Sequence, residues 1–310
     1  MSAGALVGFG ALAVILVTVF SASATAIVAA SGVRRSGPAA ERSAAAWALL
    51  APVALALAIV VTLGVLGAIG DDHCVGHDHH AHFCLVHGAA WLERPWAVVV
   101  AVAASATFLA RIVAVIARRW RAARAIRQVQ RVADRDKRVR IAISDRVFCF
   151  VAGHRPEIFV SSRAWDALGE DERDAMIAHE RAHIEHGDLW LGPVVEAAAV
   201  VAAPLCGSWL RARWSVASEQ LCDTQAATAT SPETVASALV RLCRAGHAQH
   251  VPAGFTATGD ELDERVRAVL ADAPTGERLG RRAWGALFVA LATIALLATP
   301  LHHLLETLLG

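Results

Sequence analysis

The chain has 310 residues, enough for one or two domains, and 56% of them are hydrophobic. A mean hydropathy of +0.47 excludes an ordinary soluble domain. The formal net charge is only +1, so bulk charge predicts no direct nucleic-acid partner. The composition therefore predicts a membrane protein.

Four apolar segments are close in length to the ~20 residues that a helix needs to cross a bilayer. They are residues 5–30, 44–70, 96–117 and 283–301. The first lacks a basic start and exceeds a usual signal core, so it is interpreted as a retained membrane helix. Arginines follow the first and third segments and precede the fourth. This bias predicts a multi-pass protein of the bacterial cytoplasmic membrane with segment 118–282 in the cytosol.

Between the second and third apolar segments, the predicted external loop 71–95 is rich in histidine and cysteine. Two interpretations stay open: a disulfide-closed loop with solvated histidines, or a metal or redox sensor that binds Zn²⁺ or copper. The candidate residues are Cys74, Cys84, His77, His79, His80 and His82. Because this loop lies on the opposite membrane face from segment 118–282, it cannot contribute to a site there.

After the third segment, residues 118–140 are strongly basic. Such a run can bind nucleic acid, but a helix lying along anionic lipid is favoured next to a membrane span. Three short strands are then expected at residues 139–143, 147–151 and 157–160. Segment 118–282 is therefore predicted to fold as a cytosolic α+β domain.

A helix is expected from Gly169 to His186, with Gly187 just beyond its end. It carries His179-Glu180-Arg181-Ala182-His183. Residues four apart share a helix face, so both imidazoles point at one place. Two histidines at this spacing make half of a zinc site, and the glutamate is placed to accept a proton from water.

A third ligand is expected downstream, at Glu219. Asp223 lies four residues further on the same helical face and is expected to accept a hydrogen bond from a ligand imidazole. The alternatives are a solvated acidic pair and histidines that bind no metal. Residues 189–210 are apolar but contain Glu196. If they formed a single membrane span, Glu219 would lie on the opposite side of the membrane from His179 and His183, and the site could not assemble. Segment 189–210 is therefore predicted to be interfacial or re-entrant.

Three motifs now form a recognisable set: Pro156-Glu-Ile-Phe-Val160, the His179–His183 motif followed by Asp188, and Glu219-x-x-Cys222-Asp223. Together they resemble the BlaR/MecR-type membrane zinc metallopeptidases, relatives of the HtpX-type proteases. The resemblance implies His179, His183 and Glu219 on Zn²⁺ and Glu180 as the base. It also implies cleavage of a winged-helix repressor, or of the chain itself, in signal transduction. Only a few residues follow Leu301, so the penicillin-binding sensor domain of the antibiotic-sensing members is not expected.

The expected fold is a mainly α polytopic membrane protein of about four transmembrane helices with an inserted cytosolic α+β zincin-like (gluzincin) metalloprotease domain. Its parts are 1–117, with three membrane helices; 118–282, the protease domain; and 283–310, a fourth membrane helix with a short external tail. The expected partners are a protein or peptide substrate and the lipid bilayer, and homodimerisation is left open.

The expected function is that of a zinc-dependent endopeptidase, with a zinc transporter or a non-catalytic metal-binding sensor as alternatives. Charges along the motif helix argue against a transporter span, and the intact Glu180 argues against a sensor. An oxyanion donor would come from His154, Arg241, His247 or His250, since the chain has no tyrosine. An exposed strand, 147–151 or 157–160, could bind substrate by strand addition.

Overall fold

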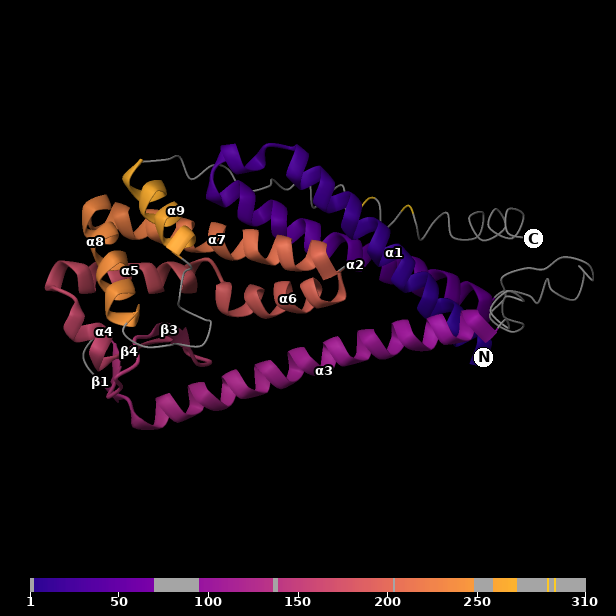
Figure 1. Cartoon of the computed structure of the whole chain (residues 1–310), viewed down its shortest axis with the longest axis horizontal. Coiled ribbons are helices and arrows are strands. Elements are labelled where there is room, and N and C mark those ends of the chain that lie inside the picture. The colour runs from indigo at the N-terminus through magenta and orange to yellow at the C-terminus, as the bar shows by residue number, and fades with distance from the viewer. Residues whose placement is uncertain are drawn as a thin grey trace, which may run out of the picture.

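The computed structural model describes residues 3–69, 95–135, 139–202, 204–247 and 259–271, with single residues 289 and 293. The fold is mostly helical, as predicted. Its helices are α1 Ala3–Ala30, the short 3₁₀ helix η1 Val33–Ser36, α2 Pro38–Ile69, α3 Pro95–Val132, α4 Ser162–Ala167, α5 Glu170–Glu185, α6 Asp188–Val201, α7 Pro204–Ala229, α8 Pro232–His247 and α9 Gly259–Leu270. Helices α1 and α2 lie side by side, α3 runs from their end of the molecule to the sheet, and α4, α5, α8 and α9 lie with the sheet at the other end (Figure 1).

Two helices are long and apolar enough to cross a membrane, among the residues described. They contain the windows Ala13–Ala30 in α1 and Pro38–Val60 in α2. Helix α3 exposes large apolar side chains such as Val99 and Ile116 along the part predicted to span. The external loop with Cys74 and Cys84 and, apart from two single residues, the fourth predicted span lie outside the described residues. The four-span topology therefore stays a prediction.

The predicted strands are confirmed, with one correction about which of them is exposed. The strands are β1 Asp134–Arg135, β2 Arg140–Ala142, β3 Cys149–Ala152 and β4 Glu157–Ser161, in the order β1-β2-β4-β3. Strand β4 pairs in parallel with β2 and antiparallel with β3, so both of its edges are hydrogen-bonded. The prediction that 157–160 could be an open edge is therefore wrong, and β3 is the edge strand next to the site.

Local signals place the motif helix where the sequence predicts it. The Ser161 hydroxyl accepts from the Ala164 N–H at 3.2 Å and thereby caps α4. Helix α5 begins after Gly169, whose N–H donates to Glu172 at 2.8 Å. It ends before Gly187, which adopts φ +71°, a left-handed conformation that favours glycine. These features fix both ends of the helix that carries the paired histidines.

Segment 189–210, which is predicted to be interfacial or re-entrant, forms most of a helical hairpin. Helix α6 leads away from α5, and α7 starts at Pro204 and returns alongside α6 (Figure 1). At Gly207 the two backbones meet, because an added Cβ would lie 2.1 Å from the Ala199 carbonyl oxygen. This return brings Glu219 back to α5. The position of the hairpin relative to a bilayer stays a prediction.

Helices α8 and α9 close the far side of the site. Val235 of α8 and Val269 of α9 pack with Ala175 of α5 and Ala226 of α7 in one buried cluster. All four side chains are nearly fully removed from solvent. Their burial holds α9, the helix that carries Arg265, against α7.

The hairpin generates a stability prediction. Gly207→Ala is expected to lower the free energy of unfolding by about 1–3 kcal/mol, because the new methyl group would overlap the Ala199 backbone. The matched control is Gly192→Ala on the partner helix, whose Cβ would make an ordinary 3.5 Å contact with Trp214. Thermal unfolding in detergent should show a lower Tm for the first variant only. Equal Tm values would contradict the backbone contact.

Candidate metal centre

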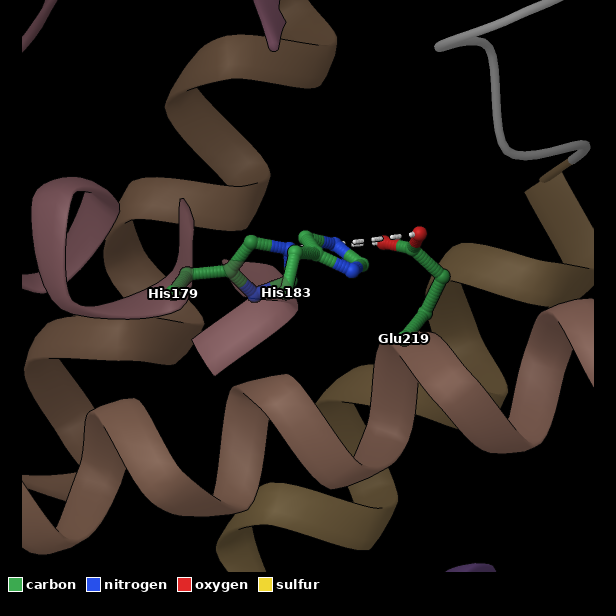
Figure 2. Close-up of side chains that lie close together, drawn as sticks. All are labelled: His179, His183 and Glu219. Atoms are coloured by element: carbon green, nitrogen blue, oxygen red, sulfur yellow. Dashed lines mark hydrogen bonds and ion pairs between the residues drawn. The ribbon is translucent and has the colours of Figure 1, made fainter. Parts of the chain in front are cut away.

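Three side chains from two helices converge at the centre of the domain. His179 and His183 project from α5, and Glu219 reaches toward them from α7 (Figure 2). The two Nε2 atoms are 3.2 Å apart. Glu219 Oε2 lies 3.5 Å from His179 Nε2, and its Oε1 lies 3.6 Å from His183 Nε2. Two imidazole nitrogens and the two oxygens of one carboxylate therefore surround one point.

The spacing of these atoms fits a tetrahedral cation. Ligands at Zn–N or Zn–O distances of about 2.05 Å are about 3.3–3.4 Å apart along the edge of a tetrahedron. The distance between the two nitrogens lies close to this value, as does the contact of each nitrogen with one oxygen of Glu219, a different oxygen for each ring. Two imidazoles and one carboxylate also form a donor set that leaves a fourth position for water. The residues present therefore fit a catalytic zinc ion.

A carboxylate holds the other nitrogen of each imidazole. His179 Nδ1 donates to Asp223 Oδ1 at 2.8 Å, and His183 Nδ1 donates to Asp188 Oδ2 at 2.7 Å. This arrangement keeps the proton on Nδ1 and turns the Nε2 lone pair toward Glu219. The sequence placed Asp223 on the ligand face, but it did not assign a partner for Asp188.

An arginine that the sequence reasoning missed supports the first of these pairs. Arg265 of α9 donates to both oxygens of Asp223, at 2.7 and 2.8 Å, and its Nη1 lies 3.1 Å from Glu219 Oε2. The side chain of Asp223 is fully buried, so it needs this cation. A signal was present, since Arg265 shares the inward face of its helix with Leu262, Val266 and Val269. A cation on an apolar face indicates a buried anionic partner.

These contacts set the charge of the site. Burial disfavours the charged form of His179, but the hydrogen bond to Asp223 and the nearby carboxylates raise its pKa to about 10. Burial also opposes ionisation of Glu219, yet the charge of Arg265 and the imidazoles hold its pKa well below the usual range. A cation that enters must therefore displace a proton from His179, and metal affinity should fall as the pH falls.

The glutamate of the motif, Glu180, is 2% exposed. Burial raises its pKa above the usual value for a glutamate, although the charges of His179 and His183 act in the opposite direction. The Cys149 thiol of β3 hydrogen-bonds the Glu180 carboxylate. Glu180 is therefore positioned from the edge strand, and burial makes its carboxylate a stronger base than an exposed one.

A second group of potential ligands, His183, Asp188 and Cys222, fits a metal less well. The Sγ of Cys222 lies 3.4 Å from His183 Nδ1, whereas it is the other ring nitrogen, Nε2, that faces Glu219. Burial and the surrounding carboxylates raise the pKa of Cys222 far above that of a free thiol, which favours the protonated form. Asp188 is already paired with Arg42. This group is therefore better explained as hydrogen-bonded support for the first.

The structure does not single out an oxyanion donor among the four predicted candidates. Arg241 pairs with Glu172, 2.9 Å away, and His154 is exposed at a turn. The side chain of His247 and the whole of His250 lie outside the described residues.

A cavity of about 680 Å³ leads to the candidate metal-ligating side chains. Its walls come from α3, from the α6–α7 hairpin and from the edge strand β3, which contributes Val151 and Ala152. His183 and Glu219 lie in the same lining. A chain segment in this cavity would contact the edge of β3 and the ligand group at the same time.

Comparison with known proteins matches residues 71–269 to a family model described as BlaR1 peptidase M56. The chain belongs to the M56 peptidase family. The match spans the predicted external loop, α3, the sheet and helices α4 to α8, and almost all of α9. M56 membership and the two apolar helices together indicate a membrane metallopeptidase. No curated protein and no solved structure matches the chain significantly.

The buried carboxylate behind His179 generates a prediction about metal affinity. Asp223→Asn is expected to weaken zinc binding by about 10–100-fold, because the amide no longer stabilises the Nδ1 proton or the charge on Arg265. Chelator competition in detergent measures this change. The control, Asp263→Asn, alters an exposed carboxylate paired within α9. An unchanged affinity for Asp223→Asn would contradict the proposed support of the ligand.

Proposed function

We propose that this protein is a zinc-dependent endopeptidase of the bacterial cytoplasmic membrane, with its active site on the cytosolic side. We further propose that it cleaves a winged-helix transcriptional repressor, or itself, in signal transduction. The observation that carries the proposal is the convergence of His179, His183 and Glu219 beside Glu180 in a chain of the M56 family. A transporter would need these charged groups in a spanning helix, whereas α5 packs among α7, α8 and β3.

Each residue of the site has a distinct chemical task. Zinc, when bound, polarises the scissile carbonyl and lowers the pKa of water. His179, His183 and Glu219 hold the ion, while Asp223 and Asp188 orient the two imidazoles. Glu180 accepts the proton of the attacking water and then passes it to the leaving amine. Its raised pKa makes the carboxylate a stronger base for the first of these transfers.

Strand β3 offers the substrate a place to bind. The Ser161 N–H donates to the Phe148 carbonyl at 3.0 Å, so residues 148, 150 and 152 form the hydrogen-bonded positions opposite β4. The N–H and C=O of Val151 therefore point away from β4, toward the open edge, and Val151 lines the cavity. A substrate can extend the sheet as an added strand beside the ligand group.

The first test separates metal binding from proton transfer. Glu180→Gln keeps the size of the side chain and should retain zinc, because Glu180 is not a proposed ligand, but cleavage should be lost by at least 10²-fold. His179→Ala should lose both zinc and cleavage. Mass spectrometry of a mixed peptide library incubated with purified protein measures cleavage, and elemental analysis measures zinc. Equal cleavage by wild type and Glu180→Gln would refute the role of Glu180.

A second test addresses strand addition. Val151→Pro removes one outward N–H without removing a donor to β4, so it should reduce cleavage strongly and leave zinc content unchanged. The matched control, Val151→Ala, shortens the side chain but keeps the N–H, and it should cleave at near the wild-type rate. Similar rates for Pro and Ala variants would argue against backbone pairing at this edge.

A further inference from the structure

Helix α2 carries one of the two candidate membrane spans, yet its first turns are buried against the metal-binding part of the chain. Glu41 and Arg42 are only 5% and 7% exposed. Both side chains belong to the first two turns of α2, and α2 packs along α7, which carries Glu219. Two charged residues buried at this junction need specific partners, because an unpaired buried charge is strongly destabilising.

Arg42 finds its partners around the metal-binding side chains. Its Nε donates to the Ser218 hydroxyl at 2.8 Å and its Nη2 to the His186 carbonyl at 3.2 Å. The same nitrogen forms a short ion pair with Asp188 Oδ1. The guanidinium also lies over the Trp214 ring, 5.6 Å from its centroid. These three acceptors and the ring face together hold the guanidinium in one orientation.

Asp188 joins this arginine to a proposed metal ligand. Its Oδ1 binds Arg42, while its Oδ2 accepts from His183 Nδ1 at 2.7 Å. The side chain of Asp188 is only 9% exposed, so water cannot replace the cation efficiently. Without Arg42, the carboxylate would be free to turn away from the imidazole. The His183 ring would then lose the contact that holds its Nε2 toward Glu219 and a metal ion.

We propose that Arg42 is a positioning residue for His183, acting through Asp188, and that the metal site is complete only when α2 is docked against α7. The proposal rests on the proposed function, since it takes the ion held by His179, His183 and Glu219 to be zinc. It assigns to a candidate membrane helix an effect, carried by Asp188, on a proposed metal ligand in the peptidase domain. Movement of α2 would then change the affinity of the site for zinc.

The chain contains a matched control for this idea. Glu41, the neighbour of Arg42 on α2, forms an ion pair with Arg213 of α7. This pair is also largely buried, with side chains 6% and 17% exposed, and it joins the same two helices. No contact described for Glu41 or Arg213 reaches Asp188. Loss of the Glu41–Arg213 pair should therefore loosen the docking of the helices without removing the cation behind His183.

The experiment measures zinc affinity and metal-free stability separately, in full-length protein in detergent. Arg42→Met should weaken zinc binding by about tenfold or more in chelator competition. Arg42→Lys should recover part of this loss, because a single ammonium can reach Asp188 but cannot also bind Ser218 and His186. Glu41→Gln and Arg213→Met should lower the Tm of the metal-free protein as much as Arg42→Met does, with zinc affinity within about twofold of wild type.

A double-variant cycle completes the test. If Arg42 acts through Asp188, Arg42→Met should cause little further loss of zinc affinity in an Asp188→Asn background. Unchanged zinc affinity in Arg42→Met, or an equal loss in the Glu41 and Arg213 variants, would overturn the inference. If Arg42→Met does not fold, the comparison of Arg42→Lys with Glu41→Gln decides by the same criteria. A wild-type protein that binds no zinc would instead refute the proposed function.

Discussion

The whole site depends on one requirement: each ligand imidazole must carry its proton on Nδ1 and turn Nε2 toward the same point. A buried aspartate enforces this at each ring, and a buried arginine neutralises each aspartate. The result is two parallel chains of contacts, Arg265–Asp223–His179 and Arg42–Asp188–His183. Each aspartate would be too costly to bury alone, so neither imidazole can be oriented without its arginine.

This requirement explains why the site draws on elements far apart in the sequence. The two arginines come from α2 and α9, the histidines from α5, and the third ligand from α7. The α6–α7 hairpin is essential to the assembly, because α7 must return to α5 for Glu219 to face the histidines. The backbone contact at Gly207 holds the hairpin closed. A backbone contact within the hairpin therefore fixes the position of a candidate metal-ligating carboxylate.

The part of the site predictable from sequence is the part that short-range geometry determines. The spacing of His179 and His183 on a helix, its end at Gly187 and the cap at Ser161 all follow from local rules, and the structure contains them. The exposed edge of the sheet depends on strand order, which local patterns do not encode, so the interpretation of 157–160 failed. Arg42 and Arg265 act through partners more than 40 residues away, and no sequence spacing marks such pairs.

Helix α7 gives the site an on-or-off character. Successive residues on a helix are separated by about 100° around its axis. A slip of α7 by a single residue would replace the carboxylate of Glu219 with the hydroxyl of Ser218 or the amide of Gln220, and it would also turn Asp223 away from His179. Intermediate positions offer the ion no third ligand. The convergence of Glu219 on the histidines and the contact of Asp223 with His179 therefore exist together in only one register of α7.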